Sequence, residues 1–266
     1  MGRLVGAYGG GIAGTALATR AWFEVVLASQ HDYALRFAAT SQQEVAVPNI
    51  TIEGDQYTVE AWVWAAPDML YRQTGSIVGR HAAGDDCRGS LDITNGRLRL
   101  LLTTADGVYH ELNAASLVPV AQWVHLAGVY DGHLARLYLN GRQTDSLAVT
   151  GAMTTGVTAR GTRIGGYAGT VGGACWFDGI IDEVRLWSVV RTPAQLRANR
   201  LRPIGPQPGL VAYWRFDEGT GESTADGSGN GYPGTLTNYD GVGTPAWVPG
   251  VFTQVDTAAL RMADEP

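Results

Sequence analysis

Short hydrophobic runs alternate with turn residues through the middle of the chain. The runs cover residues 90–94, 97–103, 108–112, 123–130, 134–140 and 143–149. Four Asn-Gly or Asp-Gly pairs stand between or before them: Asn95-Gly96, Asp106-Gly107, Asp131-Gly132 and Asn140-Gly141. Such pairs tolerate the positive φ angles of tight hairpin turns. The pattern therefore predicts a series of β-hairpins and an all-β fold.

Apolar positions recur with a period of two inside these runs. In residues 134–140, Ala135, Leu137 and Leu139 alternate with polar or amphipathic neighbours. Alternation of this kind is typical of a strand with one buried face. The hairpins are therefore expected to form sheets that bury one side each.

One short helix is predicted after the last strong strand signal. Thr192 suits the N-cap, Pro193 suits the first helical position, and Gln195 completes a capping box, so the helix should end near Asn199. Around it we predict three segments. They are a glycine-rich arm or targeting segment (1–30), a main domain (31–202), and a Pro-rich linker with a C-terminal segment (203–266).

Composition narrows the function classes. Among the 266 residues, 45% are hydrophobic, which is enough for a sizeable core. The net charge of -6 and the absence of a basic stripe argue against nucleic-acid binding. The apolar stretch 4–18 is interrupted by glycines, so it predicts no membrane span and matches a signal peptide poorly.

Two cysteines, Cys87 and Cys175, each precede a predicted strand. No CxxC or Cys/His spacing for zinc occurs. In an exported protein a disulfide between them is expected, whereas two partly buried thiols are the alternative. The sequence leaves both open.

Several stretches together resemble the LamG (laminin-G-like, concanavalin A-like) jellyroll family. They are 33–37 (YALRF), 58–63 (TVEAWV), 123–132 (WVHLAGVYDG), 137–141 (LYLNG) and 177–187 (FDGIIDEVRLW). The resemblance implies a two-sheet antiparallel jellyroll sandwich in an extracellular or cell-surface protein. It also implies a binding partner that is a glycan or an extracellular protein.

The C-terminal stretches 209–219 and 226–231 resemble the segment that normally opens such a domain. Either they fold back as a strand of the same sandwich or they belong to a neighbouring copy. In one departure from the family, Phe37 is followed by Ala38 rather than by Asp-Gly, so a metal ligand carried there would be missing.

Asp182 is the most informative candidate for a metal ligand. In a regular strand it shares an apolar face with Ile180, Val184 and Leu186. A carboxylate buried there needs an arginine, backbone N–H groups or Ca²⁺ as its partner. The resemblance implies structural calcium, with two co-ligands from the opening-type segment. These are Asp217 and Asp226, whose alternative role is turn capping.

A second candidate site adjoins the cysteines. Asp85 and Asp86 precede Cys87, and Trp176 follows Cys175. If the disulfide forms, acidic groups lie beside an aromatic ring and could hold a sugar. The alternative is a solvated acidic turn and a tryptophan of the core.

Catalysis is not expected. A laminarinase-like glycoside hydrolase needs two carboxylates on one strand face, in the pattern Glu-x-Asp-x-x-Glu, which is missing. Adjacent Asp182 and Glu183 would point to opposite faces of a regular strand. We therefore predict a non-catalytic recognition module. The alternative is a structural subunit of a surface layer or filament that self-assembles by strand or arm exchange.

Overall fold

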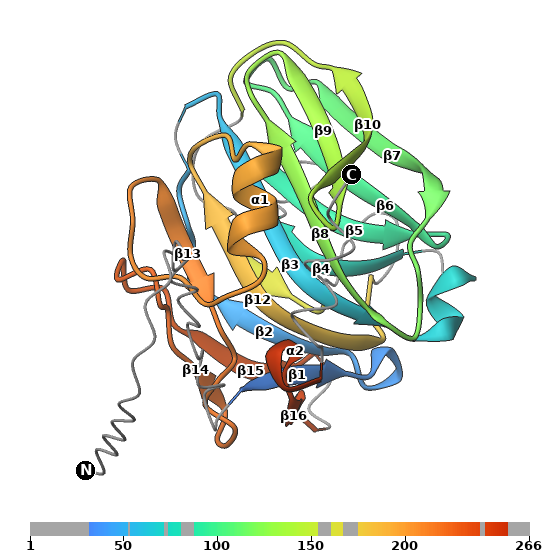
Figure 1. Ribbon diagram of the computed structural model, residues 1–266, viewed down its shortest axis with the longest axis vertical. Helices are drawn as coiled ribbons and strands as arrows, with labels where there is room; N and C mark the ends of the chain where they lie inside the picture. Colours follow the sequence, from blue (N-terminus) through green and yellow to red (C-terminus); the bar gives the residue numbers. More distant parts are fainter. Residues whose placement is uncertain are drawn as a thin grey trace, which may run out of the picture.

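The computed structural model describes residues 32–52, 54–71, 74–80, 88–153, 161–166, 175–239 and 243–254 (Figure 1). The strands are β1 Tyr33–Phe37, β2 Gln43–Val47, β3 Tyr57–Ala65, β4 Thr74–Arg80, β5 Arg88–Thr94, β6 Arg97–Thr103, β7 Tyr109–Leu117, β8 Trp123–Tyr130, β9 Leu134–Leu139, β10 Arg142–Ala148, β11 Thr162–Ile164, β12 Gly179–Trp187, β13 Leu210–Trp214, β14 Ser223–Thr224, β15 Gly234–Asn238 and β16 Ala246–Pro249. The α-helices are α1 Pro193–Asn199 and α2 Val251–Gln254, and single 3-10 turns cover Ala39–Ser41 and Pro67–Leu70.

The strands form two eight-stranded sheets. Sheet A has the order β10-β9-β8-β3-β12-β1-β16, with β13 also paired to β12. Sheet B has the order β14-β15-β2-β11-β4-β5-β6-β7. Sheet A faces the viewer in Figure 1, and α1 lies across its outer side. The predicted two-sheet antiparallel sandwich is confirmed.

The predicted turns join the strands where the sequence placed them. Asn95-Gly96 connects β5 to β6, and Asn140-Gly141 connects β9 to β10. The φ angles of Asn95 and Asn140 are 48° and 51°, in the left-handed region that these turns require.

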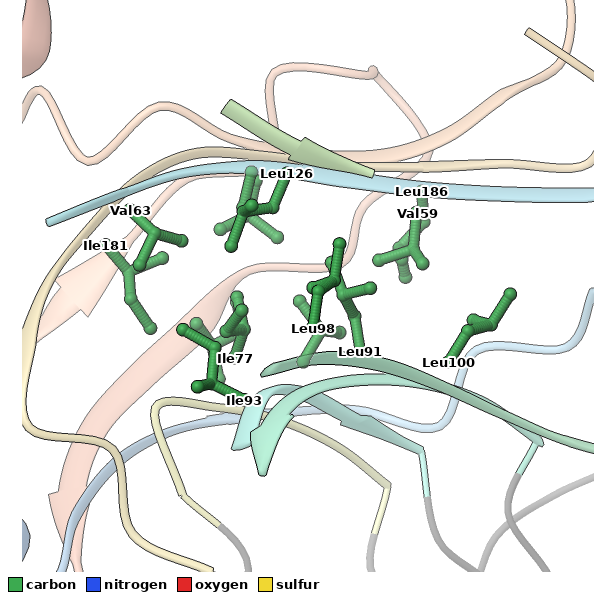
Figure 2. Packing of buried hydrophobic residues seen from close by; sticks show 14 of the residues in the cluster. Val59, Val63, Ile77, Leu91, Ile93, Leu98, Leu100, Leu126, Ile181 and Leu186 are labelled. Atoms are coloured by element: carbon green, nitrogen blue, oxygen red, sulfur yellow. The ribbon is translucent and has the colours of Figure 1, made fainter. Parts of the chain in front are cut away.

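The core lies between the facing sheets, and Figure 2 shows side chains entering it from both. Sheet A contributes Val59, Val63, Leu126, Ile181 and Leu186, and sheet B contributes Ile77, Leu91, Ile93, Leu98 and Leu100. All ten are buried. Each fully buried aliphatic side chain contributes roughly 1.5–3 kcal/mol, so this layer is the main source of stability.

The C-terminal strands belong to the same sandwich. β13 pairs with β12, β15 pairs with β2, and β16 pairs with β1. Trp214 and Phe216 are fully buried in the core. In the described residues the opening-type segment therefore folds back onto its own chain.

Helix α1 begins as predicted. The Thr192 hydroxyl accepts a hydrogen bond from the Gln195 N–H, and the Gln195 side chain accepts one from the Thr192 N–H. Its buried Leu196 packs against β8 and β9. Within the described residues, no helix combines the length and apolar character needed to cross a bilayer.

Candidate functional site

Five side chains line up across the outer face of sheet B: Ser76, Asp92, Arg99, Glu111 and Asn113. We call these five residues the polar row. Ser76 pairs with Asp92, Asp92 with Arg99, and Arg99 with Asn113, on strands β4 to β7. The neighbouring residues of β5 and β6 point into the core (Figure 2), so side-chain alternation sends the row outward.

Ion pairing organises the polar row. Arg99 Nη2 lies 3.0 Å from Asp92 Oδ2, and Arg99 Nη1 lies 3.8 Å from Glu111 Oε1. Asn113 Nδ2 donates to Glu111 Oε1 at 2.7 Å. Burial alone would lower the pKa of Arg99, but the charges of Asp92 and Glu111 outweigh it and raise that pKa above its ordinary value. The guanidinium is therefore held as a cation between two carboxylates.

Three polar atoms of the row lack partners among the described residues. They are Ser76 Oγ, Asp92 Oδ1 and Arg99 Nε, all buried. Ser76 and Asp92 are each only 1% exposed. Buried polar groups almost always have a protein, water or ligand partner. These three atoms are closed off from solvent, so the accessible part of the row is made by the exposed side chains of Glu111 and Asn113.

Two aromatic rings lie near the Ser76 end of the polar row. The centroids of Trp176 and Tyr239 lie 6.0 Å apart, and Tyr239 is 58% exposed. The indole of Trp176 lies close against Gly166, where a Cβ would come within 2.2 Å of the ring. The Cys175 carbonyl accepts from the Ser76 N–H at 3.2 Å, which places this segment next to β4. The predicted ligand residue Trp176 is thus at the end of the row.

The other predicted residues of this site cannot be placed. Asp85, Asp86 and Cys87 lie outside the described residues, so a Cys87–Cys175 disulfide stays a prediction. Burial, reinforced by the charge of Asp92, raises the pKa of the Cys175 thiol to about 11. Cys175 therefore lies within electrostatic range of the row.

A second polar layer covers the outer face of sheet A, and sequence reasoning missed it. Glu60 accepts from Trp187 Nε1 at 2.9 Å and lies 3.1 Å from His125 Nε2. Arg185 Nη1 lies 3.9 Å from Glu60 Oε1. Burial alone would raise the pKa of Glu60, but His125 and Arg185 lower it below its ordinary value. The sequence contains a signal for this layer, because Glu60 stands between Val59 and Ala61, which both enter the core.

The segment around α1 closes this second layer. Trp62 Nε1 donates to the Arg200 carbonyl at 2.6 Å, and Arg185 Nη1 donates to the Asn199 carbonyl at 2.9 Å. Trp62 and Arg185 are at most 1% exposed. The layer therefore anchors α1 to the sheet, and its charged groups are shielded from solvent.

Asp182 is fully buried. The prediction that it shares the core-facing side of its strand with Val184 and Leu186 is wrong. Glu183 has φ 53°, and the register with β3 shifts between Asp182 and Arg185. This β-bulge lets Ile181 and Val184 both enter the core. Asp182 pairs with Trp62 and lies on the outer side of sheet A.

On the outer side of sheet A, Asp182 accepts hydrogen bonds from backbone N–H groups. Its Oδ1 accepts from the Glu183 N–H and its Oδ2 from the Val251 N–H, both at 2.8 Å. Burial, followed by the charges of Glu183 and Asp32, raises the pKa of Asp182 well above its ordinary value. The adjacent carboxylates interact, contrary to the opposite-face expectation. Asp32 is an acidic neighbour that the sequence did not single out.

The two expected co-ligands have other partners. Asp217 is paired with Arg215, while burial raises the pKa of Asp217 to about 6. Asp226 caps a turn, and its donors are the backbone N–H groups of Tyr213, Ser228 and Tyr232 and the Ser228 hydroxyl. Within the described residues no three His, Cys, Asp or Glu side chains converge as a metal site. The residues present do not fit a calcium ion held by Asp182, Asp217 and Asp226 together.

Comparison with known proteins identifies the family to which the chain belongs. The Laminin_G_3 model, described as the concanavalin A-like lectin/glucanases superfamily, matches residues 39–197, which is more than half of the chain. Pappalysin-1 of Mus musculus is 30% identical over 185 residues. That alignment covers 61% of this chain but only 11% of pappalysin-1.

Two solved structures share the fold. One is a Bacteroides ovatus protein assigned a carbohydrate-binding role, with TM-score 0.65 and 19% identity, covering 83% of this chain and 60% of its own. The other is the heptameric SAP-like pentraxin of Limulus polyphemus, with TM-score 0.57 and 15% identity, covering 85% of this chain and 98% of its own. At these identities the likeness concerns the fold alone.

Proposed function

Since the chain belongs to the Laminin_G_3 family of the concanavalin A-like lectin/glucanases superfamily, we propose that it is a non-catalytic module that binds a glycan through the outer face of sheet B. The observation that carries this proposal is the polar row, whose Glu111 and Asn113 are exposed, together with the aromatic pair Trp176 and Tyr239 near its Ser76 end. We further propose that it acts outside the cell or at its surface. The described carbohydrate-binding role of the Bacteroides ovatus neighbour supports the ligand class.

The chemistry of the row suits a sugar. Saccharide hydroxyls both donate and accept hydrogen bonds, and their C–H faces pack on aromatic rings. The exposed Glu111 and Asn113 side chains supply acceptors and a donor, and Tyr239 supplies an exposed ring near the other end of the row. A small number of polar groups beside an aromatic surface is typical of a small-molecule binding site.

Several observations support a non-catalytic role. A glycosidase needs two carboxylates that face each other across the scissile bond. Asp92 and Glu111 instead bind the same guanidinium, that of Arg99. Glu60 and His125 are buried beneath the α1 segment. We expect no release of reducing sugar from any glycan that the protein binds.

A structural subunit built by strand exchange has less support. The strands that could be donated, β13 and β16, pair with β12 and β1 of their own chain. Calcium is not part of the proposed binding mode, because the predicted ligands do not converge. We therefore expect chelator to leave glycan binding unchanged.

Tyr239→Ala tests the proposed face. The purified chain is first screened on an array of neutral and acidic glycans, and the affinity for the best ligand is then measured by titration calorimetry. Loss of the exposed ring should weaken binding by roughly fivefold to tenfold. Tyr71→Ala is the matched control, because Tyr71 is 86% exposed and lies outside the row. Binding of no glycan, or equal loss in both variants, would refute the proposal.

A further inference from the structure

We infer that Asn95 is a modification site, where the folded protein deamidates spontaneously and faster than at its other Asn-Gly pairs. In this reaction the backbone nitrogen of the following glycine attacks the side-chain amide carbon of asparagine. A bond from that nitrogen to Cγ forms, the bond from Cγ to Nδ2 breaks, and ammonia leaves with the proton of the backbone nitrogen. Water then opens the resulting cyclic imide to aspartate or isoaspartate. No enzyme takes part, and the inference is independent of glycan binding.

The chain offers a matched comparison among its three Asn-Gly pairs, Asn95-Gly96, Asn140-Gly141 and Asn230-Gly231. Glycine has no side chain to obstruct the attack, so all three pairs are intrinsically reactive. Asn95 and Asn140 also share one backbone conformation, with φ of 48° and 51°, and their glycines have φ of 73° and 75°. Any difference between these two turns must therefore come from what surrounds them.

The side chain of Asn95 is not held. Asn95 is exposed in the turn between β5 and β6, and among the described residues its amide has no hydrogen-bond partner. The amide can therefore rotate toward the Gly96 nitrogen without breaking a contact. Its exposure also gives water access to the imide.

Asn140 is tied to the neighbouring strand. Its Oδ1 accepts from the His125 N–H at 2.9 Å, and its own N–H donates to the His125 carbonyl at 2.7 Å. The Gly141 carbonyl accepts from Arg197 Nη1 of α1 at 3.1 Å. Attack by the Gly141 nitrogen needs movement of the amide and of the turn, so it requires these hydrogen bonds to break.

Asn230 is exposed, yet its amide is held as well. Nδ2 donates to the carbonyl groups of Leu210 and Val211, both at 2.9 Å. The Asn230 N–H donates to Ser228 Oγ at 3.2 Å. Since Nδ2 must leave as ammonia, both of its hydrogen bonds have to be given up first. Exposure alone therefore does not make an Asn-Gly pair reactive in the folded chain.

The two products at position 95 should differ in their effect on the fold. Asp-Gly suits the same tight turn as Asn-Gly, so aspartate leaves the hairpin intact. Isoaspartate adds a methylene to the main chain beside Gly96, whose carbonyl accepts from the Val118 N–H at 2.8 Å. A Cβ on Gly96 would come within 3.0 Å of Leu117 and 3.1 Å of Leu70, so the backbone there has little room to shift. Isoaspartate should therefore loosen this end of sheet B.

The test follows each asparagine in the folded, full-length protein during incubation in mildly alkaline buffer. Trypsin, which cleaves after arginine, releases residues 89–97 and 137–142, each with a single asparagine, and leaves Asn230 in residues 216–261. Mass spectrometry with fragmentation measures deamidation at each position, and methylation by an isoaspartyl methyltransferase detects isoaspartate. The control is the same chain unfolded in urea, where the three positions should react at similar rates. Asn95→Gln should remove most of the isoaspartate formed by the folded chain.

In the folded chain Asn95 should deamidate roughly tenfold or more faster than Asn140 and Asn230, because each of these has to break two or more hydrogen bonds. Asn95→Asp should melt at the temperature of wild type, whereas the fraction that contains isoaspartate should melt lower. Comparable or faster reaction at Asn140 or Asn230 in the folded chain overturns the inference. So does an intact Asn95 in the folded chain after the unfolded chain has reacted.

Discussion

At the scale of residues, the two outer faces use similar chemistry in different surroundings. Both have a buried carboxylate bonded to a basic or aromatic partner, as in Glu60 with Trp187 and Asp92 with Arg99. Glu60 lies beneath the α1 segment and is fully buried, and Asp92 is only 1% exposed. Both carboxylates are therefore closed off from solvent, and each holds the strands of its own sheet together.

His125 should make stability depend on pH. Burial lowers its pKa below the ordinary 6.5, Glu60 opposes this, and the charges of Arg185 and Arg200 lower it further. The unfolded histidine therefore takes up a proton that the folded one refuses, so stability is lost as pH falls below about 6.5. Asp182 and Asp217, whose pKa values are raised, act in the opposite direction over the same range, so the contribution of His125 is measured as the difference between wild type and a variant that lacks it, by denaturant titration between pH 8 and 5.

His125→Gln is the control for this pH dependence. A glutamine amide keeps an N–H donor toward Glu60 Oε2 but does not titrate. As pH falls from 6.5 to 5, the free energy of unfolding of wild type should therefore decrease relative to that of the variant. An unchanged slope would show that other groups cause it.

The orientation of individual side chains was the property that the sequence predicted least well. The burial of Asp182 follows from the apolar residues around it, but its face does not. A single positive φ at Glu183 shifts the strand by one position, and glutamate has no special tendency toward that conformation. Alternation rules assume a regular strand, so they fail at a bulge.

At the scale of elements, local signals were read correctly, whereas most long-range pairings could not be predicted at all. The hairpin turns and the α1 capping box depend on residues close in sequence, so they were predicted. The polar row depends on the pairing of four strands, and the rings near it come from Trp176 and Tyr239, which are far away in the chain. Of the row and its rings, only Trp176 was selected in advance, because the register between strands cannot be read from one strand at a time.

Leu196→Ala measures how firmly α1 is held. Leu196 is fully buried against Ala127, Val129 and Tyr138. Its truncation should lower the free energy of unfolding by about 2–4 kcal/mol, because a cavity forms beneath the helix. Val108→Ala is the comparison, since Val108 is 46% exposed, and its cost should stay below about 0.5 kcal/mol. Chemical denaturation followed by tryptophan fluorescence measures both, and equal costs would show that α1 is not packed as described.

At the scale of the whole molecule, the sandwich extends beyond the part that matches the family. The match ends at residue 197, whereas β13 to β16 follow it. These strands pair with β12, β2 and β1 and add Trp214 and Phe216 to the core. The matched segment should therefore be insufficient for a stable fold.

A chain ending at residue 208 tests this directly. Without β13 to β16, strands β1, β2 and β12 keep unpaired backbone N–H and C=O groups along one side. Exposed strand edges beside an uncovered core bind one another, so the shortened chain should aggregate. Light scattering after size-exclusion chromatography would detect this, with the full-length chain as reference. A shortened chain that stayed soluble, with an unchanged melting temperature, would contradict this expectation. It would mean that the sandwich is stable without β13 to β16 and that these strands contribute little to its core.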